Sequence, residues 1–440
     1  MPTPSLLIVP ARFKTGRLYS QIPTSGAGDF TVTRATAATR VNASGYIESV
    51  ASGIPRLDYF ASGGTVGCPA LLVEPSGQNL AINSQTWDSS NSWQLSDGSG
   101  RVTVATATSG TLAPDGTSTA NAITPTSGNI THYLYSNASG SISYVSGTVY
   151  TISAFFKKGA GDSGRYIQIA TANLRFLGNP YANFDLELGT TLTLSGSVAD
   201  SNRVSRIQNY GNGWYRCSLT ATCGSAGSTA VGIIAVLLTA DTNARAGTAF
   251  AGNTSDYIFG WGAQLETGSV ATSYIPTTTA AVTRNADVIS LSGAVSGCIG
   301  QTEGTMYAEF EIRSESTTRR LLTLSDGSQL NRIMLVYSSN ALRAQMQSTT
   351  ISLGNPADGY HKVAFAYQQS GVSGTLFASL DGGAVVSGTT AGTFPSVLNT
   401  INVGKIEDTA TTSQWNARIR SAAIYTSRLT NAELIALSTL

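Results

Sequence analysis

Apolar and polar residues alternate along many short segments of the chain. In residues 306–312, one side of the alternation is apolar and consists of Met306, Ala308, Phe310 and Ile312. The same period of two recurs in residues 190–194, 342–347 and 363–367. A period of two is typical of β-strands that bury one face. The pattern therefore predicts an all-β chain in which short antiparallel strands pack as sandwiches.

Turn and cap signals divide these strands. Asp326-Gly327 and Asp381-Gly382 each stand between apolar runs, and both residue types tolerate the positive φ that tight hairpins require. Near the end of the chain, Thr430 and Glu433 have the spacing of a capping box and precede the apolar residues of 434–437. One short C-terminal helix is therefore predicted.

The chain is too long for a single hydrophobic core, because 440 residues correspond to about three domains. Composition shifts near residues 74–83 and 276–300 mark the boundaries. They predict four units, listed here in chain order: an N-terminal attachment segment (1–80), a sandwich domain (81–275), a linker (276–298) and a second sandwich domain (299–440). Residues 1–80 are poor in apolar clusters, so we expect their strands to need a neighbouring chain or a docking partner.

Composition narrows the functional classes. Only 12% of the residues are charged, whereas 41% are hydrophobic and 46 are glycine. A chain this apolar folds, and its surface must be neutral and rich in hydroxyl groups. The 26 basic and 25 acidic residues nearly cancel, and no run of Lys or Arg exceeds two residues. This balance excludes a nucleic-acid footprint.

The sequence also bears on the cellular compartment. Residues 1–5 have no basic segment and the apolar run of 6–9 is short, so classical secretion is not expected. The longest strongly apolar stretch, 231–238, is well below the about 20 residues of a membrane-spanning helix. Cys217 and Cys223 share one predicted strand and would lie about 20 Å apart, so we expect reduced thiols. These features fit a particle assembled in a cytoplasm and released by lysis.

Candidate catalytic groups are few. His132 and His361, the two histidines of the chain, fall in different predicted domains, which argues against a zinc site. The segment Gly161-Asp162-Ser163-Gly164 is similar to the nucleophile turn of trypsin-like proteases, but no matching histidine motif precedes it. A polar turn is the better interpretation. No phosphate-binding or dinucleotide motif is present. We therefore predict no catalytic residue and expect that the chain is not an enzyme.

Carboxylates leave two further alternatives open. Glu309 and Glu311 could act as a pair in glycoside hydrolysis, although an exposed strand face explains them more simply. Calcium could bind at acidic loops, but the spacing of an EF-hand is missing. The loop residues concerned are Asp97, Asp115, Asp200 and Asp256. We accordingly predict no metal site and no cofactor, with calcium left open.

Tryptophans could stack on sugar rings, and the chain has five of them, at positions 87, 93, 214, 261 and 415. Trp214 precedes Tyr215 in an alternating segment, and Trp261 shares a strand face with Tyr257 and Phe259. Packing in the core is the better interpretation for at least these two tryptophans. No glycan-binding residue is assigned from the sequence.

Two longer segments carry a family resemblance. Residues 69–80, PALLVEPSGQNL, resemble a segment near the front of phage and prophage tail or appendage proteins. Residues 259–277, which include FGWGAQLETG and ATSYIPT, resemble the closing motif of the same module. Residues 150–158 and 213–216 are similar to its interior strands. The resemblance extends over about residues 69–288 and implies a carbohydrate-binding-like jelly roll.

The final domain resembles concanavalin A-like or laminin-G-like sandwiches in residues 361–365, 379–382, 401–404 and 429–434. Together the two resemblances imply a phage tail fibre, head fibre or tail-tip protein that is exposed on the virion, often as a trimer. Its N-terminal part would dock to other virion proteins, and its lectin-like part would bind host-surface glycans. The alternatives are a purely structural capsid or tail decoration and a polysaccharide depolymerase, although no solenoid repeat is present.

Overall fold

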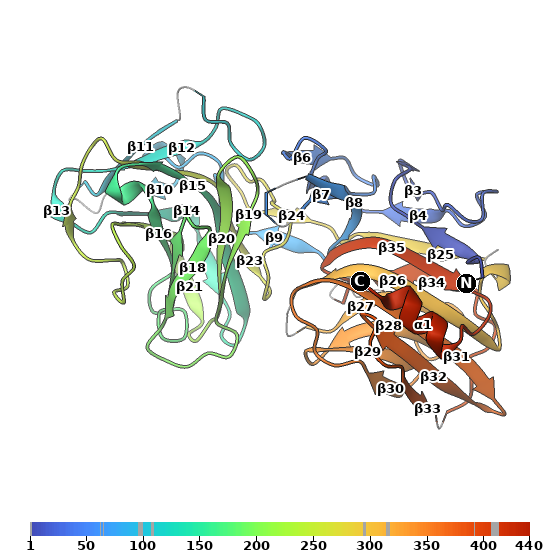
Figure 1. Ribbon diagram of the computed structural model, residues 1–440. Helices are drawn as coiled ribbons and strands as arrows, with labels where there is room; N and C mark the ends of the chain where they lie inside the picture. Colours follow the sequence, from blue (N-terminus) through green and yellow to red (C-terminus); the bar gives the residue numbers. More distant parts are fainter. Residues whose placement is uncertain are drawn as a thin grey trace.

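The computed structural model describes residues 2–61, 63–64, 66–95, 100–106, 110–293, 296–313, 317–390, 392–405 and 413–440. The named strands in these parts of the chain pair antiparallel, and most of them form two sandwiches that lie side by side (Figure 1). The one α-helix of the described residues is α1 (Asn431–Ser438). The predicted all-β class, tandem antiparallel sandwiches and short C-terminal helix are therefore confirmed. No helix in the described chain is long and apolar enough to cross a membrane.

The first sandwich consists of two six-stranded sheets. The order in one sheet is β10 (Trp93–Gln94), β14 (Tyr133–Tyr144), β21 (Gly227–Leu238), β16 (Tyr166–Thr171), β17 (Tyr181–Asp185) and β18 (Thr190–Ser195). The order in the other is β11 (Val102–Thr106), β12 (Asn121–Pro125), β23 (Tyr257–Thr267), β15 (Val149–Ala160), β20 (Trp214–Thr222) and β19 (Val204–Asn209). Buried residues of both sheets, such as Ile169 and Leu219, form one core between them. Trp87 and Trp93 stack in this core with ring centroids 4.6 Å apart.

The second sandwich consists of an eight-stranded and a nine-stranded sheet. The eight-stranded order is β33 (Val386–Thr389), β32 (Ser373–Leu380), β31 (Gly359–Ser370), β26 (Glu303–Ile312), β35 (Ala417–Tyr425), β8 (Val66–Val73) and β7 (Leu57–Phe60), with β1 (Leu6–Ile8) also paired to β35. The nine-stranded order is β2 (Phe13–Lys14), β3 (Arg17–Leu18), β4 (Phe30–Thr33), β25 (Val288–Ser292), β34 (Thr400–Val403), β27 (Arg319–Ser325), β28 (Arg332–Ser338), β29 (Ala341–Met346) and β30 (Thr349–Ser352).

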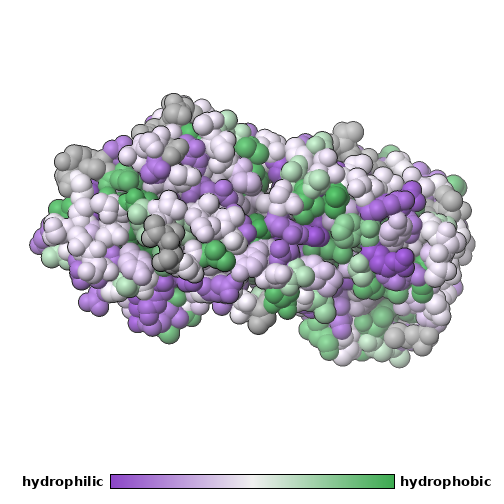
Figure 2. All heavy atoms as spheres, turned by 90° about the horizontal axis from the view of Figure 1, so that it is seen from above, coloured by the Kyte–Doolittle hydropathy of each residue, from purple (hydrophilic) through white to green (hydrophobic). Residues whose placement is uncertain are grey.

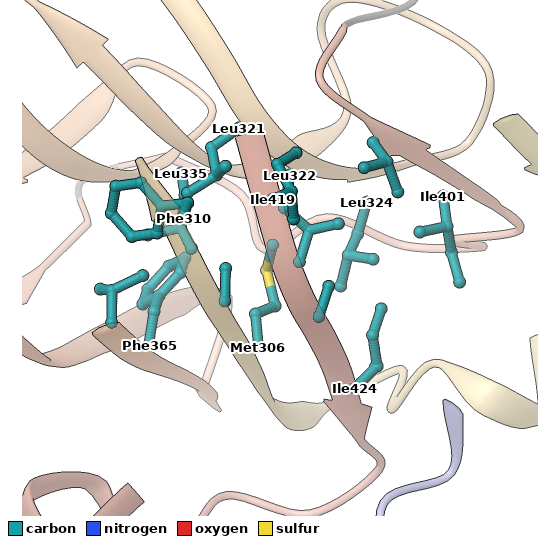
Figure 3. Packing of buried hydrophobic residues seen from close by; sticks show 14 of the residues in the cluster. Met306, Phe310, Leu321, Leu322, Leu324, Leu335, Phe365, Ile401, Ile419 and Ile424 are labelled. Carbon is teal, nitrogen blue, oxygen red and sulfur yellow. The ribbon is translucent and has the colours of Figure 1, made fainter. Parts of the chain in front are cut away.

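The core of the second sandwich lies between these sheets. Met306 and Phe310 of β26 lie in one buried cluster with Leu322 and Leu324 of β27 (Figure 3). These residues of β26 belong to the face that the alternation of the sequence predicts to be buried. Helix α1 packs outside on β31 and β32, where its Leu434 is fully buried. The predicted capping box is present, with the side chain of Thr430 accepting from the Glu433 amide.

The N-terminal residues are part of the second sandwich. Leu6 of β1 pairs with Ile424, and Val32 of β4 pairs with Ile289 of β25. The sequence-based division treats residues 1–80 as an attachment segment and 276–298 as a linker, but their strands instead complete both sheets of the C-terminal unit. The physical reason is that a short strand needs a hydrogen-bonding neighbour, which can come from anywhere in the chain. Composition carries no information on that pairing.

Residues 38–60 also join the two sandwiches. The hairpin of β5 (Ala38–Val41) and β6 (Ile47–Val50) packs on the outer face of the first sandwich, where Val41 and Ile47 meet Trp214 and Trp261. The ribbon of β9 (Gly77–Asn79) and β24 (Val282–Arg284) lies between the two sandwiches (Figure 1). A third short pair connects β13 (Asn129–Ile130) with β22 (Phe250–Ala251). Residues 1–80 thus link the sandwiches as well as completing the second one.

Candidate functional site

A cleft of ≈ 460 Å³ lies between the two sandwiches. Its size falls in the range of pockets that bind small ligands, about 300 to 1,000 Å³. Figure 2 shows the sandwiches as two lobes and pale atoms of intermediate hydropathy over much of this face of the molecule. The cleft is lined by Phe60, Gly63, Leu188, Gly189, Arg206, Ile207, Gln208, Asn209, Tyr215, Ser218, Val270, Ala271, Glu311, Ile312, Arg313, Asp358, Gly359 and Tyr360.

One wall comes from β19, the edge strand of the first sandwich. Ile207 packs against the core of this sandwich, so the alternation of the strand turns its neighbours Arg206 and Gln208 to the outer face. Tyr215 of the adjacent β20 lies next to Gly189, whose φ is +66°. A Cβ at position 189 would lie 2.6 Å from the Tyr215 ring, so glycine permits this close approach. The wall therefore combines polar groups with one aromatic ring and with apolar residues such as Leu188 and Val270.

The facing wall comes from the end of β26 and the start of β31, which pair so that Glu311 lies opposite Tyr360. Asp358 precedes β31 and reaches across the cleft to Arg206, with 3.5 Å between Arg206 Nε and Asp358 Oδ2. Both side chains are partly exposed, at 24% and 45%. The guanidinium of Arg420 lies 3.6 Å from the centre of the Tyr360 ring and covers one of its faces. The ion pair between Arg206 and Asp358 therefore bridges the two sandwiches.

The carboxylate of Glu311 is held by two arginines. Its Oε2 lies 2.9 Å from Arg418 Nη1 and 3.3 Å from Arg313 Nη2. Burial by itself would raise the pKa of Glu311, but the positive charges of Arg313 and Arg418 outweigh it and lower the pKa to about 2. Glu309, on the same strand face, contacts Arg420 at 3.2 Å. The prediction that Glu309 and Glu311 lie on an exposed strand face is therefore correct only in part, because Glu311 is largely buried in an ion-pair network.

The motif segments meet beside this cleft in a buried polar junction. Glu74, from the PALLVEPSGQNL segment, is fully buried and accepts hydrogen bonds from the backbone N–H and the hydroxyl of Ser273, at 2.7 and 2.6 Å. It also forms ion pairs with Arg56, at 2.7 Å, and with Arg284. The charges of Arg284 and Arg56 lower the pKa of Glu74 even though burial opposes them. The carboxylate therefore stays ionised in the interior.

A second carboxylate completes the junction. Asp287 forms ion pairs with Arg34, at 2.9 Å, and with Arg56, and it accepts a hydrogen bond from the Glu74 amide at 3.0 Å. The nearby Asn79 donates to the Ala263 and Ile275 carbonyls at 3.0 and 2.8 Å. These contacts tie the two motif segments to each other and to the N-terminal residues. Glu74, Asn79 and Asp287 therefore hold the architecture together from outside the cleft, whereas Tyr215, Val270 and Ala271 of the resemblance segments line it.

Both histidines have structural partners. The ring nitrogens of His132 lie 2.7 Å from the Arg101 carbonyl oxygen and 3.1 Å from that of Phe250. Those of His361 lie 2.6 Å from the Asp381 carboxylate and 2.8 Å from the Ala357 carbonyl oxygen. Within the described chain, no three His, Cys, Asp or Glu side chains gather as a metal site would require.

The protease-like turn is a buried connection. Ser163 is fully buried, and its hydroxyl lies 3.1 Å from Asp256, which also accepts from the Ser163 amide at 3.2 Å. In the part of the chain that the structure describes, this serine has no histidine partner. The interpretation as a polar turn is the one that the contacts support, since Asp256 serves as a local hydrogen-bond acceptor.

Two of the remaining acidic loop residues accept hydrogen bonds from threonines. Asp115 accepts from the amide and hydroxyl of Thr117 at 3.0 and 2.6 Å, and Asp200 accepts from the amide and hydroxyl of Thr222, both at 2.8 Å. Asp97 lies outside the described residues. Calcium binding at these loops stays a prediction.

All five tryptophans are buried, with at most 3% exposure for Trp415. The packing predicted for Trp214 and Trp261 is confirmed, and the other three are likewise not presented to a ligand. The cysteines of the chain are free thiols, and Cys217 and Cys223 are buried as expected. Sequence reasoning missed the cleft residues Arg206 and Asp358. They come from different sandwiches, and no local pattern distinguishes them from ordinary strand and loop residues.

No protein-family model matches the sequence, and no curated protein matches it. Among solved structures, the chain is similar to a Ruminococcus gnavus IT-sialidase CBM40 bound to α2,3 sialyllactose, with 15% identity, 33% of this chain and 88% of that chain covered, and a TM-score of 0.29. It is also similar to domain 4 of an extracellular arabinanase from Geobacillus stearothermophilus in complex with arabinotriose, with 14% identity, 39% and 82% covered, and a TM-score of 0.27. A Limulus polyphemus heptameric pentraxin has 13% identity, 31% and 69% covered, and a TM-score of 0.25. At this level of similarity no residue role is transferred to the chain.

Proposed function

We propose that the chain is a non-enzymatic component of a bacteriophage virion and that it binds host-surface glycans in the cleft between its sandwiches. The observation that carries the proposal is the cleft itself, which is ≈ 460 Å³ in volume and combines the Tyr215 and Tyr360 rings with the Gln208 amide. Sugars present both hydroxyl groups and apolar C–H faces. Aromatic rings with a few well-placed polar groups suit such ligands.

The sequence adds support for a virion location. Residues 69–80 and 259–277 resemble phage appendage proteins, and the low charge of the chain suits a surface exposed outside the cell. Assembly as a trimer, docking to other virion proteins and synthesis in the host cytoplasm belong to the same proposal. Binding through several copies would make weak individual contacts effective.

The charge state of the cleft favours binding over hydrolysis. A glycosidase needs a carboxylic acid whose pKa is raised so that it can donate a proton. Glu311 is the cleft carboxylate that two arginines hold, and its pKa is lowered to about 2. It therefore remains ionised near neutral pH and cannot serve as that acid. This property of Glu311 supports an adhesive protein over a depolymerase.

The test is binding of the purified protein to host cells and to a glycan array, with released reducing sugar and the solution mass measured in parallel. Saturable binding without sugar release, by a trimer, is the expected result. Sugar release would make the protein a depolymerase. Absence of both binding and release would contradict the glycan proposal and favour a decoration that only reinforces the particle. Mapping the protein on purified particles tests the virion location separately.

A further inference from the structure

We propose that the cleft selects uncharged, hydroxyl-rich sugar residues and discriminates against acidic ones. The inference rests on the proposed glycan binding and specifies the class of glycan. It is drawn from how the charged and the neutral polar groups of the cleft are engaged. The charged groups form ion pairs with one another, whereas several neutral polar groups can form hydrogen bonds with a ligand.

The cleft arginines are already matched with carboxylates. Arg206 faces Asp358 at 3.5 Å, and Arg313 faces Glu311 at 3.3 Å. Arg418, behind the wall, is shared between Glu311 at 2.9 Å and Asp58 at 2.7 Å. An acidic sugar would have to take an arginine from its carboxylate and leave that carboxylate unpaired close to its own negative charge. Leaving the largely buried Glu311 unpaired is costly, and at the more exposed Arg206 the adjacent Asp358 carboxylate repels an anion, so the cleft offers an anion no net gain.

Three neutral polar groups in the same walls are available for hydrogen bonds with a ligand. Within the described part of the chain, no hydrogen bond is formed by the Gln208 side-chain amide, the Tyr215 hydroxyl or the Tyr360 hydroxyl. Burial raises the pKa of Tyr360, so its hydroxyl stays protonated. Amides and hydroxyls both donate and accept hydrogen bonds, as sugar hydroxyls do. The arrangement therefore matches a neutral polyol and has no spare cation for a carboxylate.

Four variants follow from this arrangement. Tyr360→Phe and Gln208→Ala each remove one uncommitted group, and we expect each to weaken binding of a neutral oligosaccharide about 3- to 10-fold, the effect of one hydrogen bond. Asp358→Asn frees Arg206 from its carboxylate, and we expect it to improve binding of an acidic oligosaccharide. Tyr257→Phe is the matched control, because Tyr257 lies outside the cleft, and it should leave the affinity unchanged.

The experiment is titration calorimetry of the full chain with neutral gluco-, galacto- and manno-oligosaccharides and with uronic-acid oligosaccharides of equal length, at low and high salt. We expect the neutral set to bind about tenfold or more tightly than the acidic set, with little salt dependence. Tighter, salt-sensitive binding of the acidic set would overturn the inference and leave glycan binding intact. Neutral binding that Tyr360→Phe and Gln208→Ala do not weaken would overturn it too, since the ligand would then lie elsewhere. Failure to bind any oligosaccharide would overturn the proposed function itself. Circular dichroism confirms that each variant folds.

Discussion

Replacing Glu74 by Gln tests whether the buried junction holds the two sandwiches together. Glu74 receives two hydrogen bonds from Ser273 and ion pairs with Arg56 and Arg284, all in the interior. Gln has nearly the same shape, so the substitution removes the charge and leaves the volume unchanged. Arg284 then loses its ion-pair partner, and Arg56 retains only Asp287.

The expected loss of stability is large because both arginines are fully buried. Removing one partner of a buried ion pair costs about 3 to 5 kcal/mol, since the remaining charge stays desolvated without compensation. The matched control is Glu187→Gln, which removes the same charge from two exposed pairs, with Lys158 and with Arg165; the side chains are 42% exposed in Glu187 and Lys158 and 31% in Arg165. Exposed pairs contribute little, so this control should unfold with the wild-type midpoint.

The assay is denaturation in guanidinium chloride, followed by tryptophan fluorescence, with a midpoint read for each transition because two sandwiches need not unfold together. We expect Glu74→Gln to lower the midpoint of the transition that separates the sandwiches. The reasoning would be refuted by equal midpoints for Glu74→Gln and Glu187→Gln. In that case apolar packing, and not the ion pairs, would account for the stability of the junction.

Acid should destabilise the fold, because the pKa of Glu311 falls from 4.5 to about 2 on folding. The contribution of Glu311 to the free energy of unfolding is complete above pH 4.5 and is lost as the pH falls toward 2. Melting temperatures measured at stepped pH would show this loss. A melting temperature that stays flat over this window would contradict this. Gly161→Ala should lower the melting temperature, because φ is +75° and a Cβ would lie 1.8 Å from Asp256; an unchanged value would show that the turn relaxes. Thiol reagents should label the exposed Cys68 in the native protein and Cys217, whose pKa burial raises, only after unfolding. Rapid native labelling of Cys217 would contradict its burial.

Local signals predicted the local structure well. Alternation over residues 306–312 identified a strand and its buried face, because the period of two determines which side chains point into a sandwich. Asp381 and Gly382 both adopt positive φ, as the hairpin signal required. The spacing of Thr430 and Glu433 identified the start of α1. In each case the determining interaction lies within a few residues, so the sequence alone contains it.

Pairings between distant residues could not be predicted in the same way. Leu6 pairs with Ile424, and Val73 pairs with Ala417, across most of the length of the chain. A three-residue strand such as β1 has no pattern that specifies its partner, and the partner decides to which sheet it belongs. The composition of residues 1–80 led to the expectation of a neighbouring chain or a docking partner, whereas β1 and β8 pair with the C-terminal part of the same chain.

The recognisable segments contribute mainly to the buried junction, although Tyr215, Val270 and Ala271 also line the cleft. Glu74 and Asp287 are buried among arginines, so almost any substitution there leaves an unpaired charge, and only a narrow set of residues fits. Gln208 and Tyr360 border open space, where a different side chain changes the hydrogen bonds offered to a ligand at little cost to folding. It follows that the motif identifies the scaffold, and that ligand preference must be determined from the walls of the cleft.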